Sequence, residues 1–185
     1  MANDAVTTAV VTGKVRFSYA HVFEPSSIDN NPESAKYSVS LIIPKRDKKT
    51  LATIKTIIDR LAGEWMVKNN KKVLPAGFKM PLRDGDEERS EDESYEDSFF
   101  VNASSKKQPG IVKKGAMGLE KITDEEDFYS GCYGKADINF YIFDKAGNKG
   151  IACGLNNLLK LEDGDSLSGG RSATAAFADE ADDLM

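Results

Sequence analysis

Cysteine and histidine are scarce in this 185-residue sequence, which contains only Cys132, Cys153 and His21. Two cysteines cannot build a disulfide framework, so we expect a reducing compartment and two buried thiols that act as small hydrophobic groups. So few sulfur and imidazole ligands nearly exclude a structural zinc site, and they leave a serine–histidine–aspartate triad only one base. We therefore expect no metal, no cofactor and no catalysis.

Long apolar runs are also missing, so no segment is expected to span a membrane. The first residues lack the positive region followed by an apolar stretch that marks a secretory signal. The composition, with 40% hydrophobic and 9% aromatic residues, suffices for a real core, and the length suits one domain. We expect a single domain over residues 1–170 and a flexible acidic tail over 171–185.

The net charge of −5 hides an uneven distribution. Residues 84–97 hold nine acids and one arginine, a charge of −8, and the last seven residues carry −4, which leaves +7 for the rest. Blocks of like charge repel themselves and stay solvated, so we expect both to be mobile, the first as a hairpin tip. Calcium binding is the alternative for the first block, but Glu88 and Arg89 stand where an EF-hand loop needs its third ligand and its glycine.

Hydrophobic periodicity predicts a mainly β protein with one helix. After an N-cap at Asp47, apolar residues recur every three or four positions over 51–66, which predicts an amphipathic helix packed on a sheet. Gly13 marks a bulge in the first strand, and a Gly147–Asn148 pair marks a hairpin turn before a partner strand. Four to six strands around one helix fit a small, curved antiparallel barrel or sheet. The strands expected from alternation and β propensity are 6–23, 36–43, 98–104, 132–144 and 150–155.

One face of the strand over 132–144 mixes aromatic rings, a lysine and an amide on a surface that should be wet. Single-stranded nucleic acid needs this combination, because cations follow phosphates while flat rings stack on bases. Duplex DNA buries its base faces and offers exposed rings nothing to stack on. The phosphate candidates are Lys14, Arg16, Lys36, Lys106, Lys107 and Lys135; the stacking candidates are Phe100, Tyr133 and Tyr141, with Asn102 as a hydrogen-bonding partner.

Several alternatives stay open from the residues alone. Tyrosines on an outer strand face are common, and Phe100 fits a barrel core as well. A nuclease around Asp47, Lys48 and Lys49 lacks a second acid at recognisable spacing. A virion assembly protein and a strand-annealing recombination protein are the other classes. RNA is an alternative ligand, because stacking and phosphate contacts do not require a missing 2′-hydroxyl.

Four stretches resemble a family of bacteriophage single-stranded DNA-binding proteins. The resemblance implies an oligonucleotide/oligosaccharide-binding (OB) fold, sequence-independent binding of single strands, and a role in phage replication, recombination or repair. It also implies action in the cytoplasm of a bacterial host, at the nucleoid or at replication sites. The stretches are 13–25 (GKVRFSYAHVFEP), 36–44 (KYSVSLIIP), 99–112 (FFVNASSKKQPGIV) and 129–157 (YSGCYGKADINFYIFDKAGNKGIACGLNN).

The resemblance further implies that the acidic C-terminus recruits replication or recombination proteins. This end finishes in Leu-Met and lacks the bacterial Pro-Phe terminus. The block at 84–97 is more acidic than a DNA-contacting hairpin should be, so we assign it no DNA role. Oligomeric state does not follow from the sequence, and a homodimer stays open. The residues expected to bind partners are Asp179, Glu180, Asp182, Asp183, Leu184 and Met185.

Overall fold

A computed structural model describes residues 7–27 and 29–167 of the chain. The tail expected over 171–185, including the acidic partner-binding residues, lies outside them. Within the described residues, strands dominate and α1 (Lys48–Lys68) is the one long helix, beside the short helices α2 (Gly85–Glu88) and η1 (Glu93–Tyr95). The strands are β1 Ala9–Val11, β2 Val15–Ser26, β3 Lys36–Pro44, β4 Leu82–Asp84, β5 Ser98–Ser105, β6 Gly110–Gly115, β7 Gly118–Lys121, β8 Tyr133–Lys145 and β9 Asn148–Glu162.

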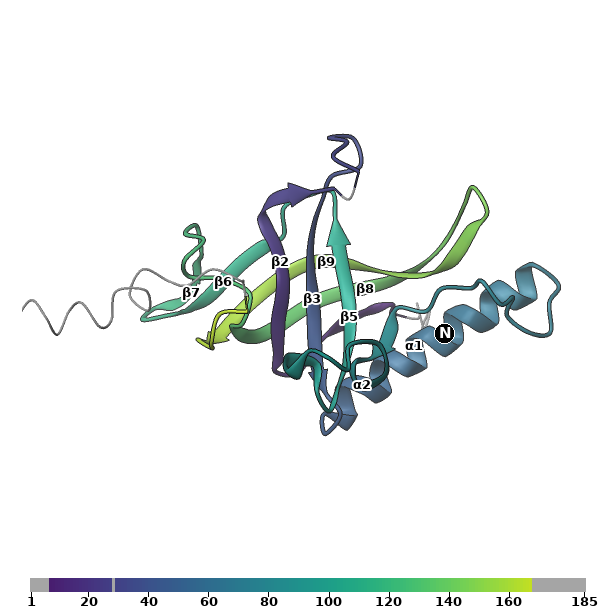
Figure 1. Cartoon of the computed structure of the whole chain (residues 1–185), viewed down its shortest axis with the longest axis horizontal. Helices are drawn as coiled ribbons and strands as arrows, with labels where there is room; N and C mark the ends of the chain where they lie inside the picture. Colours follow the sequence, from purple (N-terminus) through teal and green to yellow (C-terminus); the bar gives the residue numbers. More distant parts are fainter. Residues whose placement is uncertain (1–6, 28, 168–185) are drawn as a thin grey trace, which may run out of the picture.

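Five strands close into a barrel, because each of them pairs with two others of the five (Figure 1). Around the ring, β2 pairs with β3, β3 with β5, β5 with β9, β9 with β8 and β8 with β2. The β5–β9 pair is parallel, and the other four are antiparallel. A five-stranded ring with one packed helix is the architecture of an OB fold, so the predicted fold class is confirmed.

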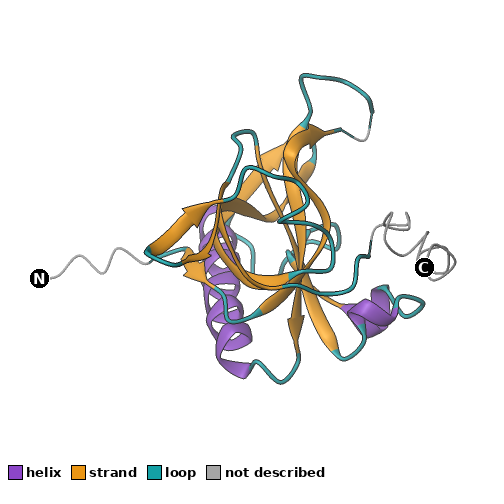
Figure 2. Cartoon of the chain, turned by 90° about the vertical axis from the view of Figure 1, so that its left-hand side faces the viewer, coloured by secondary structure: helices purple, strands orange, loops and turns teal. Residues whose placement is uncertain are grey.

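The helix begins where the sequence predicts. The carboxylate of Asp47 accepts a hydrogen bond from the backbone N–H of Thr50 at 3.2 Å and so caps α1. One face of the helix, which includes Ile54, Leu61 and Trp65, is buried against the barrel. Figure 2 shows α1 and α2 on opposite sides of the strands. The long helix α1 therefore covers the core on one side of the strands, and α2 lies on the opposite side.

The first predicted strand is broken into β1 and β2 at Gly13, which forms no bulge. The backbone N–H of Gly13 donates to the Thr50 hydroxyl at 2.9 Å, and a Cβ there would lie 2.4 Å from a carboxylate oxygen of Asp47. A glycine is needed because the chain passes so close to the start of α1.

The predicted hairpin turn between β8 and β9 is displaced by one residue. Lys145 pairs with Asn148, so the two turn residues are Ala146 and Gly147, with φ values of 51° and 84°. Positive φ at both positions is the geometry of a type I′ turn, which matches the twist of the flanking strands.

The barrel core follows the predicted alternation along β8. Ala136, Ile138 and Phe140 point inward and are buried. Cys132 and Cys153 are buried as expected, and burial raises the pKa of both thiols, which keeps them protonated and unreactive. Over 7–27 and 29–167, no helix combines the length and apolarity needed to cross a bilayer, and no three metal-binding side chains gather.

Candidate nucleic-acid interface

The outward residues of β2, β3 and β5 form one continuous surface, which we call the outer face. Residues paired directly across antiparallel strands project to the same side, so the strand register defines this surface. In OB folds the second and third barrel strands present the oligonucleotide-binding surface, and here these are β3 and β5. The outer face consists of Arg16 and Ser18 on β2, Lys36, Ser38, Ser40 and Ile42 on β3, and Phe100, Asn102 and Ser104 on β5.

One half of this surface is open to solvent. Asn102 is exposed in the middle of β5, and Lys36 is exposed where β3 begins. Since Tyr37 pairs with Ser105, Lys36 lies at the same end of the sheet as the β5–β6 loop. Within the described residues, none of the lysines at this end makes an ion pair. The open half comprises Lys36, Ser38, Asn102 and Ser104 with Lys106 and Lys107 of that loop.

A hollow of about 650 Å³ adjoins the open half. Its lining includes Asn102 and Ser104 of β5, Phe143 of β8, and Arg83 of β4 with its partner Glu88. Polar, cationic and aromatic side chains around one hollow are the kinds of contact that a nucleotide needs for its phosphate and base, and Glu88 holds the Arg83 cation in this conformation.

The other half, Ser40, Ile42 and Phe100, is covered by residues 84–97. This segment includes α2 and η1 and packs on the outer face. Tyr95 is 0% exposed: its ring centroid lies 5.1 Å from that of Phe100 at an interplanar angle of 82°, and its hydroxyl lies 2.9 Å from the Ser40 Oγ, to which it donates. Ile42, Tyr95 and Phe100 form a buried cluster separate from the barrel core. The acidic block connects the antiparallel strands β4 and β5, as predicted for a hairpin tip, but it is folded onto the sheet, so the expectation of a solvated tip is wrong.

Arg89, the single base of the segment, contacts three aromatic rings at the covered half. Its guanidinium carbon lies 5.2 Å from the ring centroids of Tyr19, Tyr95 and Phe100, within the range of cation–π attraction. Its Nη1 also donates to the Tyr19 hydroxyl at 3.3 Å. Arg89 thus ties the segment to β2 as well as to β5.

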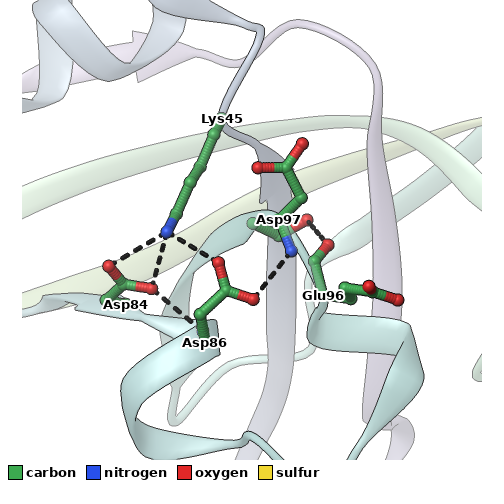
Figure 3. A network of polar contacts seen from close by, with 6 residues as sticks. Lys45, Asp84, Asp86, Glu96 and Asp97 are labelled. Atoms are coloured by element: carbon green, nitrogen blue, oxygen red, sulfur yellow. Dashed lines mark hydrogen bonds and ion pairs between the residues drawn. The ribbon is translucent and has the colours of Figure 1, made fainter.

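Carboxylates of the segment pair with two cations of the barrel. Figure 3 shows the Lys45 ammonium between Asp84 and Asp86, at 3.0 and 2.8 Å. Lys45 and the backbone N–H of Asp97 both donate to Asp86 and lower the pKa of its carboxyl, and the same pairing raises the pKa of Lys45. The Arg83 guanidinium donates from Nε and Nη2 to Glu88 at 2.6–3.0 Å.

The beginning of β2 brings together three of the predicted DNA-binding residues. The Lys14 ammonium and the Arg16 guanidinium lie 5.3 and 5.2 Å from the ring centroid of Tyr133 on β8. Lys14 pairs with Glu162, and Arg16 donates to the backbone carbonyls of Gly131 and Asp165 at 3.1 and 2.9 Å. A hollow of about 700 Å³ connects this group to Arg46 and to Glu93 of the acidic segment.

Two predicted residues lie away from the outer face, and a third is inaccessible. Tyr141 is exposed, but eight residues of β8 separate it from Tyr133, about 26 Å at 3.3 Å per residue. Lys135 is exposed on β8 opposite Leu159 of β9. Phe100 does project from the predicted surface, but it is 0% exposed beneath Tyr95, so no base can stack on it in this conformation.

Sequence reasoning missed Lys45, Arg83, Arg89 and Tyr95. One signal was available on β3, where Ile42 breaks the alternation of apolar and polar residues. An apolar side chain at an outward position indicates a second contact on that side of the sheet. Arg89 and Tyr95 were the other signal, because a base and a ring inside an acidic run suit packing better than solvation.

Comparison with known proteins relates the chain to phage proteins. The sequence model described as "Enterobacter phage Enc34, ssDNA-binding protein" matches residues 8–185. Putative protein p50 of Acyrthosiphon pisum secondary endosymbiont phage 1 is 31% identical over 175 residues, which cover 92% of this chain and 90% of p50.

Solved structures give the same relation. The single-stranded DNA-binding protein of bacteriophage Enc34 in complex with ssDNA is 25% identical with a TM-score of 0.68, over 87% of this chain and 90% of that one. The single-stranded DNA-binding protein gp2.5 of bacteriophage T7 is 13% identical and shares the fold, with a TM-score of 0.60 over 89% of this chain and 97% of that one. The chain thus belongs to the family of the Enterobacter phage Enc34 single-stranded DNA-binding protein.

Proposed function

We propose that this protein binds single-stranded DNA with little base preference and acts in phage DNA replication, recombination or repair inside the host cell. The open half of the outer face is the observation that carries the proposal. It presents exposed Asn102 and Lys36 on the strands that OB folds use for oligonucleotides, with Lys106 and Lys107 in the adjoining loop, and none of the three lysines makes an ion pair within the described residues. Membership of a family of single-stranded DNA-binding proteins supports the same ligand.

The DNA strand runs along the outer face in this proposal. Six residues of β3 separate Lys36 from the position paired with Arg16, a distance of about 20 Å. Phosphates meet the lysines of the open half at one end and Arg16 with Lys14 at the other. Tyr133 offers its ring to a base at the second end, and Asn102 offers hydrogen bonds in between. Lys135 and Tyr141 extend the contact around the barrel along β8.

A fluorescence titration with oligo-dT at several salt concentrations tests the electrostatic part. Six cations on phosphates predict a log–log slope of roughly −4, because each contact to a single strand contributes about −0.7. A slope near zero would remove the phosphate contacts from the proposal. Matched titrations with the duplex and with the corresponding RNA measure the preference for single strands and for DNA.

The acidic C-terminus, Asp179 to Met185, completes the proposal as the part that recruits replication or recombination proteins. Its acids and its Leu-Met end offer charge and a small apolar contact to a partner. Pull-down from infected cells with the full chain and with residues 173–185 removed tests this role. Partners that bind both forms equally do not use the tail.

A further inference from the structure

Four outward residues of the sheet, Ser18, Ser40, Ile42 and Phe100, are dry although no strand or long helix of the described residues packs on them. Ser40 and Ile42 are each 3% exposed and Phe100 is 0% exposed. Tyr95 and Arg89, both from residues 84–97, are the groups in contact with Phe100 on that side, together with Arg83 at the base of the segment. The segment therefore occupies part of the surface on which OB folds bind oligonucleotides.

The contacts of this segment are of the kinds that a single strand makes. Tyr95 places an aromatic ring against Phe100 and a hydroxyl against Ser40. Asp84, Asp86 and Glu88 place negative oxygens on Lys45 and Arg83. A base needs a ring to stack on and a phosphate needs cations, so the segment satisfies the groups that DNA would otherwise use.

The contacts that hold the segment on the sheet also allow it to be displaced. Its two helices are only four and three residues long. Its ion pairs are partly exposed to solvent, so each ion pair contributes little to holding the segment on the sheet. Tyr95 is its one large buried side chain, and the cluster that Tyr95 joins is separate from the barrel core. Asp97, with φ of 50°, bends the chain where the segment meets β5.

We infer that residues 84–97 form a built-in cap, which closes the covered half in the free protein and is displaced when single-stranded DNA binds. This inference rests on the function proposed above. In the closed state Phe100 is buried, and Lys45 and Arg83 are paired with acids of the cap, so opening frees all three for DNA. Apparent affinity is then the intrinsic affinity multiplied by the fraction of molecules with an open cap.

Weakening the cap should therefore tighten binding. Tyr95→Ala removes the buried ring and the hydrogen bond to Ser40, and we expect about tenfold tighter binding of oligo-dT, as for an open fraction near one tenth. Tyr95→Phe keeps the ring and loses only the hydroxyl, so we expect a smaller gain of about threefold. Weaker or unchanged binding by both variants overturns the cap.

A matched pair of charge variants separates cap release from general electrostatics. Glu88→Gln and Glu87→Gln each remove one negative charge from α2. Glu88 holds Arg83, whereas Glu87 makes no side-chain hydrogen bond or ion pair in the described part of the chain. We expect Glu88→Gln to bind oligo-dT at least threefold more tightly than Glu87→Gln. Equal affinities overturn a role of the Arg83–Glu88 pair in closure.

Hydrogen exchange on the unaltered full chain gives a readout that depends on no variant. In the free protein, the amides of Arg89, Tyr95 and Glu96 donate to carbonyls within the segment. Saturating oligo-dT should speed exchange in 85–97 while it slows exchange in β3 and β5. Binding with unchanged or slower exchange in 85–97 overturns the cap alone. No binding, with no change in any strand, overturns the proposed function itself.

Discussion

The open and covered halves of the outer face share their strands, their register and their distance from the core, yet one is wet and the other is dry. Asn102 is exposed, while Phe100, two residues earlier on β5, is fully buried. Val101, the inward residue between the two positions, is buried. The difference is made by residues 84–97, together with Arg83 beside them on β4. Exposure of an outward residue thus depends on the segment that lies over it as much as on strand alternation.

The largest effect is expected from comparing buried rings on the two sides of the sheet. Phe17→Ala removes a ring that packs on Phe128 at 4.8 Å inside the barrel, and we expect the free energy of unfolding to fall by about 3–5 kcal/mol. Tyr95→Ala should cost only about 1–2 kcal/mol, because its cluster lies outside the core. Urea unfolding measures both. Equal losses of unfolding free energy in the two variants would indicate that the covered half is part of the core.

The next largest effect is expected from reversing charge in the open half. Lys36→Glu combined with Lys106→Glu should weaken binding of oligo-dT about 100-fold at low salt and reduce the salt slope by about 1.4. Lys71→Glu with Lys72→Glu is the matched control, since it makes the same charge change in the exposed loop after α1 (Figure 1). If the control loses as much affinity, the effect comes from net charge and not from the outer face.

Stacking should contribute about tenfold. Tyr133→Ala removes the ring that Lys14 and Arg16 both approach, and one stacked base is worth about 1–3 kcal/mol. Tyr141→Ala tests whether the bound DNA continues along β8. The double variant tests whether the rings of Tyr133 and Tyr141 act independently. Fluorescence titration with oligo-dT gives all three affinities. Unchanged affinity in the double variant would remove stacking on β8 from the mechanism.

The smallest effect is expected from acid. Lys45 and the Asp97 N–H lower the folded-state pKa of Asp86. At pH values above about 4, the ordinary pKa of an aspartate, the ionised Asp86 carboxylate therefore helps to keep the cap closed. That help is lost as the pH falls through the lowered folded-state value. NMR between pH 6 and 3 should show the Arg89 and Tyr95 amides shifting below about pH 4, while the Phe17 amide stays unchanged. Simultaneous shifts in all three would indicate global unfolding.

Much of the fold was predictable, because its signals are local. The helix after Asp47 and the alternation of Ala136, Ile138 and Phe140 each follow from a few neighbouring residues. The break at Gly13 was not predictable, since the start of α1, which it passes, lies more than thirty residues further along the chain.

The site was predicted less completely. Lys14, Arg16 and Tyr133 do lie together, as a basic and aromatic surface requires. The folded position of residues 84–97 was missed, because net charge outweighed a single tyrosine in the sequence argument. Burial of Tyr95 and its hydrogen bond to Ser40 depend on β3, which is distant in the sequence. The composition of a segment indicates how well water solvates it, whereas contacts with distant residues decide whether it packs on the rest of the protein.

The parallel pairing of β5 with β9 has a consequence for synthesis on the ribosome. The ring stays open until residues 148–162 have left the exit tunnel, because β9 pairs with both β5 and β8. Until then Ala103 and Ser104 of β5 lack their partners on β9, and the helix has only part of its packing surface. Pairings between distant segments form slowly. A chain truncated before Asn148 lacks β9 and therefore cannot close the ring.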